Sequence, residues 1–305
     1  MITKTSVPVP TCYRIAGHLV EVEAEERNIH DSVLGLPVFR IVTGLSGGKP
    51  LLRLDESAPP DDGYCRDGAR TVRFMAGAFA CALSCGADEY RFSMSLPEGN
   101  GQWQSSMYCC DGTFHARIAA GQDTPHFVTH FSLWIVFGVA ALHRDTAAIH
   151  ASAVMHGGRA VLCLGESGTG KSTHTRLWTE HIPDTELLND DSPFITAASG
   201  ESRVYGSPWS GKTPCYRAID VPLAALVRIR QASFNHIRRL SALEAIGAVL
   251  PSFPPEFACD SALSGFIHSI LSAVLCNTPV YLLECLPDAE AAWLAHDTLK
   301  RDGRL

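Results

Sequence analysis

The sequence predicts an α/β protein in which a smaller β-rich part, residues 1–122, precedes a larger part, residues 123–305, where strands and helices alternate. Three observations predict this organisation: an apolar period of two in the first part, a long helix-like segment after residue 122, and short apolar runs separated by amphipathic segments beyond it. With 305 residues, 46% of them hydrophobic, the chain can bury the core of one large domain or two ordinary ones.

Alternating residues predict half-buried strands in the first part. Apolar and polar side chains alternate in residues 20–25 and again in residues 90–96. Asp111 and Gly112 precede a further alternating run, residues 114–118, and an Asp-Gly pair in this setting is typical of a hairpin turn. We therefore expect an antiparallel meander, and a β-rich domain here could select a substrate or partner.

The pattern changes after residue 122. Residues 125–143 have the length and the apolar stripe of a helix, so a domain boundary is predicted between residues 122 and 123. Further strands are predicted at residues 148–155, 160–164, 186–189, 193–196, 223–229 and 279–286, and further helices at 173–181, 242–250 and 259–276.

Residues 165–173 contain the complete pattern G-x-x-x-x-G-K-[ST], known as Walker A, directly after an apolar run. In such a P-loop the glycines let successive N–H groups point at phosphate oxygens, Lys171 reaches the outer phosphates, and the Ser172 hydroxyl is placed for a magnesium ion. The alternative is an accidental glycine-rich turn, which the predicted strand before it and helix after it disfavour. The predicted nucleotide-binding residues are Gly165, Glu166, Ser167, Gly168, Thr169, Gly170, Lys171, Ser172 and Thr173.

Asp190 and Asp191 follow a short predicted strand soon after the P-loop. If that strand lies beside the P-loop strand, one carboxylate can reach the magnesium ion and the other can meet a substrate hydroxyl. Adjacent side chains on an extended strand point in opposite directions, so the two aspartates need not share a role. The alternative is that residues 189–193 are only a turn, because all five residue types favour turns.

Two further polar groups are candidates for the same site. His150 stands in an apolar strand-like run, where an imidazole needs a hydrogen-bond partner, and the acidic pair is one possibility. A satisfied core histidine is the alternative. Lys212 ends a glycine-flanked loop, residues 206–212, and could face a phosphate or a substrate, or belong to a surface turn.

Taken together, these motifs resemble the HPr serine kinase/phosphorylase family and its HPr-kinase-like relatives, over roughly residues 130–290. The matching segments are residues 150–154, the P-loop, Asn189 with the two aspartates, and residues 206–212. The resemblance implies a P-loop kinase core, similar in its nucleotide-binding part to phosphoenolpyruvate carboxykinase, preceded here by a smaller β-rich domain. It also implies transfer of the γ-phosphoryl group of ATP to a serine hydroxyl with Mg2+.

The resemblance assigns Lys171 to the β- and γ-phosphates, Ser172 to magnesium and the aspartates to the transfer site. We expect Asp190 to be the base and Asp191 to be a metal ligand or the partner of His150, with an exchange of the two roles left open. The family's second glycine-rich signature is absent after the aspartates, where residues 206–212 stand instead. HPr itself is therefore not assigned as the acceptor.

The leading hypothesis is an ATP- and magnesium-dependent kinase acting on a hydroxyl of a protein, peptide or small molecule, with serine first. One alternative is an ATP-binding regulator that transfers no phosphate, and another is a carboxykinase-related enzyme. A regulator needs the phosphate and magnesium contacts but no proton acceptor, so the two classes separate at Asp190.

Charge and composition exclude other classes. The net charge of −7 disfavours nucleic acid as the main partner, although Arg228, Arg230, Arg238 and Arg239 form a local basic cluster that we expect on a solvated face. No signal-like segment and no apolar run of about 20 residues is present, so a cytoplasmic protein without membrane contact is predicted. The 11 cysteines lack zinc-module spacing. The family resemblance makes a homo-oligomer an expectation.

Overall fold

The computed structural model describes residues 10–23, 26–42, 48–54, 70–97, 101–198, 200–258 and 260–305. The chain forms two compact units, Met1–Ala140 and Ala141–Leu305, which we call the first and the second unit. Each unit contains one nine-stranded sheet, and the described residues include seven α-helices, so the predicted mixed α/β class is confirmed. The division between the units falls at the end of a helix, whereas the domain boundary predicted from the sequence precedes that helix.

The first unit is β-rich. Its elements are β1 (Thr11–Ile15), β2 (His18–Val22), α1 (Glu26–Ser32), the 3-10 helix η1 (Leu36–Phe39), β3 (Arg40–Ile41), β4 (Leu52–Leu54), β5 (Arg70–Ala76), β6 (Phe79–Cys85), β7 (Glu89–Ser95), β8 (Gln102–Cys110), β9 (Thr113–Arg117) and α2 (His126–Leu142). The strand order is β3-β1-β2-β4-β9-β8-β7-β6-β5. Residues 24 and 25 of the predicted strand at 20–25 lie outside the described residues.

Strands β5 to β9 form the predicted antiparallel meander. Asp111 and Gly112 make the β8–β9 turn with φ angles of 50° and 74°, the left-handed values that a two-residue hairpin loop requires. The short strand β4 differs, because it pairs in parallel with both β2 and β9. A three-residue strand between partners so distant in sequence leaves no periodic signal.

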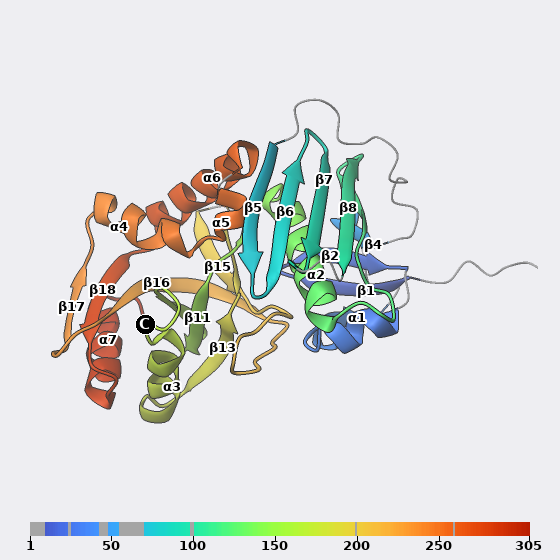
Figure 1. Cartoon of the computed structure of the whole chain (residues 1–305). Coiled ribbons are helices and arrows are strands. Elements are labelled where there is room, and N and C mark those ends of the chain that lie inside the picture. The colour runs from blue at the N-terminus through green and yellow to red at the C-terminus, as the bar shows by residue number, and fades with distance from the viewer. Residues whose placement is uncertain are drawn as a thin grey trace, which may run out of the picture. The chain divides into compact units, whose positions relative to one another are not determined.

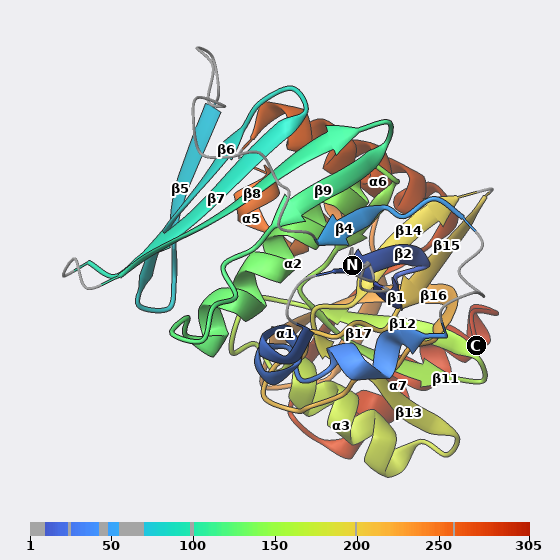
Figure 2. The ribbon, with the colours of Figure 1, turned by 90° about the vertical axis from the view of Figure 1, so that its right-hand side faces the viewer.

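Helix α2 confirms the helix predicted at residues 125–143. Its apolar residues pack on the meander: the ring of Phe127 lies 5.4 Å from that of Phe79, and the ring of Phe131 lies 6.3 Å from that of Phe74. Figure 2 shows this green helix beside the β5–β9 strands. Among the described residues, no helix has both the length and the apolar character needed to cross a membrane.

The second unit alternates strands and helices. Its elements are β10 (Thr146–Ala148), β11 (Ala151–His156), β12 (Arg159–Leu164), α3 (Lys171–His181), β13 (Thr185–Asp191), β14 (Phe194–Ala198), β15 (Glu201–Tyr205), β16 (Asp220–Gln231), β17 (His236–Arg239), α4 (Ala242–Val249), the 3-10 helix η2 (Leu250–Ser252), α5 (Pro255–Ala258), α6 (Ser261–Asn277), β18 (Val280–Cys285) and α7 (Ala289–Arg301). Five of the six strands predicted after residue 143 are present with shifted ends, as are the three predicted helices. The sixth, predicted at 148–155, is divided between β10 and β11, so His150 lies in neither strand. Residue 259 of the helix predicted at 259–276 lies outside the described residues.

Parallel pairs form the centre of the second sheet. Its order is β10-β14-β15-β16-β12-β11-β13, with β18 beside β16 and β17 at the edge. The β12–β16 and β16–β18 pairs are parallel. Figure 1 shows α3 and α7 on one side of the sheet and α4 and α6 on the other. The face under α3 and α7 forms a core that includes the fully buried Trp178 of α3.

One expectation about strand order is wrong. Strand β13, which carries the aspartates, does not lie beside the P-loop strand β12, because β11 lies between them and pairs with both. The reason is the tight β11–β12 turn, where Gly157 and Gly158 both have positive φ angles and make the two strands neighbours. The polar residues at the end of β13 are thus brought to the site across the strand that follows His150.

Candidate functional site

Residues 165–173, which we call the glycine loop, connect the end of the buried strand β12 to the first turn of α3. Gly170 is the N-cap of α3 and has a φ angle of 102°, a left-handed conformation that favours glycine. The first turn of α3 contains no acidic side chain. Its free N–H groups and the positive end of the helix therefore favour an anion at this point.

The side chain of Lys171 folds back onto the first residues of the glycine loop. Its side-chain Nζ donates hydrogen bonds to the carbonyl oxygens of Gly165, at 2.9 Å, and Glu166, at 3.1 Å. An ammonium group has three donors, so these two contacts leave one for a phosphate oxygen. Burial lowers the pKa of Lys171, and Arg228 lowers it further, while Asp191 and Asp190 act in the opposite direction.

Two side chains from β16 also hold the glycine loop. Gln231 donates to the carbonyl oxygen of Gly168 at 3.2 Å, and the guanidinium of Arg228 lies 3.7 Å from the carboxylate of Glu166. The Arg228 side chain is only 19% exposed. The expectation that Arg228 lies on a solvated face is therefore wrong, because the parallel β12–β16 pairing brings this arginine to the loop.

Asp190 faces the start of α3. This residue is buried, with 3% exposure, and its Oδ1 accepts a hydrogen bond from the Ser172 hydroxyl at 2.8 Å. On the neighbouring strand, Ser152 is paired with Asp190 and shares a 2.7 Å hydrogen bond with Thr175 of α3. These contacts join the end of β13 to the first turns of α3.

The carboxylate of Asp191 lies near His150. The Oδ1 atom of Asp191 lies 3.5 Å from His150 Nε2, and the two side chains are 54% and 44% exposed. Asp191 has a φ angle of 111°, which is uncommon for a residue other than glycine and is typical of strained functional positions. Burial lowers the pKa of His150, and Lys171 adds to this, although Asp191 and Asp190 oppose it. His150 is therefore mainly neutral near pH 7.

The loop that begins at residue 206 is anchored to β13 through Asn189. The fully buried Asn189 amide donates to Ser207, Trp209 and Cys215, and its oxygen accepts from the Ser192 N–H. Ser210 donates to the carbonyl of Asp190 at 3.0 Å. This anchoring role of Asn189 was not predicted, although the residue stands in the quoted motif.

Lys212 is the predicted site residue that the structure does not bring into contact with the others. It is exposed, and it follows Gly211, whose N–H donates to the carbonyl of Asp190. Its ammonium thus lies on a segment attached to the site, while the glycine loop, His150, Asp190 and Asp191 are brought together directly.

A cavity of about 360 Å³ adjoins the glycine loop. It is lined by Gly168, Thr169, Gly170, Thr173, His174, Leu177, Ile229, Gln231, Ala232, Cys285, Leu286 and Pro287. His174 is buried, and burial lowers its pKa to about 4. Its Nε2 accepts from the Trp178 indole at 3.0 Å, so Nδ1 carries the proton, and that atom has no partner among the described residues. Sequence reasoning missed this buried histidine, which lines the cavity together with apolar side chains such as Leu177 and Ile229.

Comparisons with known proteins give little direct information. No family model and no curated protein matches the sequence. Among solved structures, the Hpr(Ser) kinase/phosphatase from Coxiella burnetii is similar, with 13% identity over 52% of this chain and 95% of that chain, at a TM-score of 0.29. Likeness at this level carries no information about what the chain does.

Proposed function

We propose that the protein is an ATP- and magnesium-dependent kinase that transfers the γ-phosphoryl group to a hydroxyl, first of all that of a serine. The observation that supports this most is the placement of two carboxylates with different surroundings at one end of the glycine loop. Asp190 is buried and bonded to Ser172, whereas Asp191 is half-exposed beside His150. We also propose that the second unit has a P-loop kinase core of the HPr kinase type.

The oxygen atoms of Ser172 and Asp190 fit a magnesium ion. Magnesium prefers oxygen ligands at about 2.0–2.1 Å in octahedral geometry, so two adjacent ligands lie about 3 Å apart. The Ser172 and Asp190 oxygens are 2.8 Å apart. Bound magnesium would neutralise charge on the phosphate oxygens.

These contacts favour an exchange of the roles expected from the sequence. Asp190 is engaged with Ser172, so we propose Asp190 as the metal ligand and Asp191 as the base. In the transfer, the acceptor oxygen bonds to the γ-phosphorus, the bond to the β–γ bridging oxygen breaks, ADP leaves, and the acceptor proton passes to Asp191. The His150 contact at 3.5 Å orients that carboxylate.

The cavity beside the glycine loop favours a nucleotide over a bare phosphate. Apolar side chains such as Leu177 and Ile229 suit the face of a base. The glycine loop N–H groups and Lys171 are then proposed to hold the phosphates. ATP is accordingly the proposed donor.

A transfer assay tests the proposal. The purified full chain is incubated with γ-labelled ATP, magnesium and fractionated extract of the source cell, and label is followed into macromolecular and small-molecule fractions. Asp191→Asn should lower transfer by roughly 10²–10⁴-fold while ATP affinity is retained. Asp184→Asn, at the opposite end of β13, is the matched control and should transfer normally.

One outcome would overturn the kinase proposal, and another would change the assignment of the base. Tight ATP binding without transfer into any fraction would favour the regulator, which needs no base. Full transfer by Asp191→Asn, together with loss in Asp190→Asn, would return the base to Asp190. The fraction that takes up label also identifies the acceptor as a protein, a peptide or a small molecule.

A further inference from the structure

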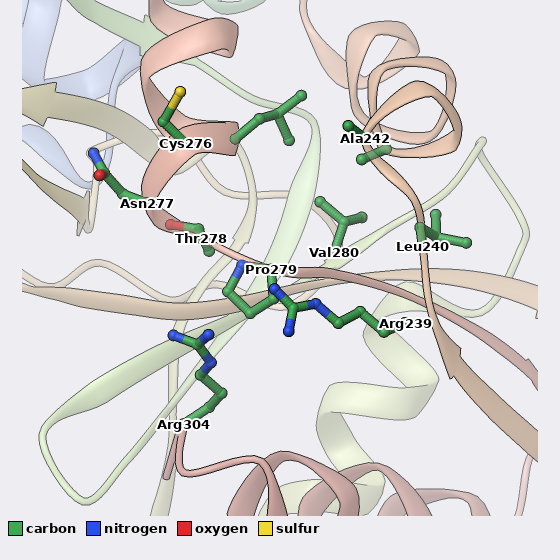
Figure 3. Close-up of a pocket in the computed structure, with 11 residues that line it drawn as sticks. Arg239, Leu240, Ala242, Cys276, Asn277, Thr278, Pro279, Val280 and Arg304 are labelled. Carbon is green, nitrogen blue, oxygen red and sulfur yellow. The ribbon is translucent and has the colours of Figure 1, made fainter.

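The second unit contains another cavity, of about 200 Å³, which we call the arginine cavity. It is lined by Arg239, Leu240, Ala242, Ala245, Leu275, Cys276, Asn277, Thr278, Pro279, Val280 and Arg304. None of these eleven described residues is acidic, and two of them are arginines. In Figure 3, Arg239 and Arg304 both extend toward Pro279. The charge of the lining is therefore positive.

Arg304 is held in this position by the end of α7. Gly303 has a φ angle of 69°, and the N–H of Arg304 bonds to the carbonyl of Leu299 at 2.9 Å, which turns the chain back toward β18. The Tyr281 hydroxyl donates to Asp302 at 2.8 Å and fixes the same turn. The Arg304 Nε atom is buried and has no hydrogen-bond partner among the described residues.

Thr278 contributes a second unsatisfied group. It is the C-cap of α6, it is only 3% exposed, and its hydroxyl oxygen also has no partner among the described residues. A buried polar atom without a partner destabilises the folded state, and such atoms call for a water, an ion or a ligand. Both unsatisfied atoms belong to residues that line the arginine cavity.

The arginine cavity lies at the opposite end of β18 from the proposed nucleotide site. Val280, the first residue of β18, lines the arginine cavity, whereas Cys285, the last, lines the cavity beside the glycine loop. A six-residue strand spans roughly 17 Å, at about 3.3 Å per residue. A ligand in one cavity therefore does not occupy the other.

We propose that the arginine cavity binds a phosphate group, either free or on a small organic molecule. Guanidinium groups form paired hydrogen bonds with phosphate oxygens, and the Thr278 hydroxyl supplies a further donor. The volume of about 200 Å³ is below the roughly 300–1,000 Å³ of sites for drug-sized ligands, so the occupant is small. This assignment does not rest on the proposed kinase activity.

Isothermal titration calorimetry with inorganic phosphate, at constant ionic strength, tests the proposal on the full chain. Arg304→Gln and Thr278→Val should each weaken phosphate binding by about tenfold or more. Arg238→Gln is the matched control, because Arg238 does not line the cavity and instead pairs with Glu244 at 2.8 Å. Lys171→Ala should retain the binding, which separates this site from the glycine loop.

Thr278→Val also removes the unsatisfied hydroxyl, so the midpoint of thermal unfolding of this variant should equal or exceed that of the wild type. If Arg304→Gln does not fold, Thr278→Val alone is used for the binding test. Glycerol 3-phosphate, titrated in parallel, separates the two sources: tighter binding than phosphate indicates an organic ligand, and weaker binding indicates free phosphate. No measurable binding up to about 10 mM phosphate would overturn the proposal. The proposal would also be overturned if phosphate binding were abolished in Lys171→Ala and retained in Thr278→Val.

Discussion

The strands of the first unit are joined mostly by short turns, whereas several strands of the second unit end in polar loops that contact one another. In the first unit, β5 to β9 follow each other as antiparallel neighbours. In the second unit, the parallel strands β12 and β16 deliver the glycine loop and Arg228 to the same edge. Parallel pairing gathers residues distant in sequence, so chemistry is expected in the second unit and stability or partner contacts in the first.

The largest expected effect is a loss of stability in the first unit, and it tests whether ATP binding in the second unit depends on the packing of the first. Phe92 of β7 is 2% exposed, and Phe92→Ala should lower the free energy of unfolding by about 3–5 kcal/mol through lost burial and a cavity. ATP affinity of the folded chain should not change. Chemical denaturation followed by circular dichroism, with calorimetric titration of ATP, measures both. Val38→Ala, at a 49% exposed position of the first unit, is the control. A parallel loss of ATP affinity in the still-folded variant would contradict the independence.

A comparable effect on function, without one on stability, is expected at the glycine loop. Lys171→Ala should lower phosphoryl transfer by roughly 10²–10³-fold, because a cation near the transferred group is lost. Lys212→Ala provides a matched comparison and should have a smaller effect, since that lysine is exposed. Initial rates with labelled ATP and thermal denaturation of both variants give the comparison. Equal losses in the two variants would place Lys212 in the phosphate site.

The buried His174 of the second unit should make the free energy of unfolding depend on pH. The pKa of His174 is about 4, below the unfolded value of 6.5, so its neutral form stabilises the fold above pH 6.5 and this contribution is lost as the pH falls toward 4. The loss is about 3 kcal/mol. In His174→Gln, the urea concentration at the unfolding midpoint should change less between pH 7 and pH 4.5 than in the wild type. Replacement of the exposed His268 by Gln should leave this change of the midpoint with pH as it is in the wild type. An unaltered change of the midpoint with pH in His174→Gln would refute this origin.

The smallest of these effects is a change in the magnesium requirement, which distinguishes the two carboxylates. Asp190→Asn should raise the magnesium concentration needed for half-maximal transfer by roughly 10–100-fold, because it weakens the oxygen pair with Ser172. Asp191→Asn should leave that concentration nearly unchanged and lower the maximal rate instead. Magnesium titrations of transfer rate at saturating ATP measure both quantities. The reverse pattern would exchange the two roles again.

Local patterns were sufficient to predict many elements. The Asp111-Gly112 turn, the apolar helix α2 and the glycine loop before α3 each depend on neighbouring residues, and all three conformations are present. Strand β17 was missed because its four residues include two arginines and a histidine, and it pairs only at the sheet edge. Helix α7 was also missed, although Asp288 caps it through the N–H of Ala291 and its residues favour helix.

The site was harder to predict than the fold because its contacts are not local. The pattern identified the glycine loop, His150 and the aspartates as candidates, but no spacing shows that β11 lies between β12 and β13. The contact of Arg228 with the glycine loop depends on a parallel pairing, and the bonds of Asn189 depend on a loop many residues later. Burial of His174 likewise depends on the packing of α3 against the sheet.

The position of β11 also determines the order in which the site can assemble during folding. The β11–β12 hairpin joins residues that are close in sequence and pairs Ala151 with Leu164. Ala151 follows His150, and Leu164 precedes the glycine loop. His150 and the glycine loop therefore come together as soon as the β11–β12 turn forms. The β12–β16 pairing, which matches Ala160 with Leu223, must close a much longer stretch of chain. During folding, His150 and the glycine loop can therefore become neighbours before Arg228 and Gln231 of β16 contact the glycine loop.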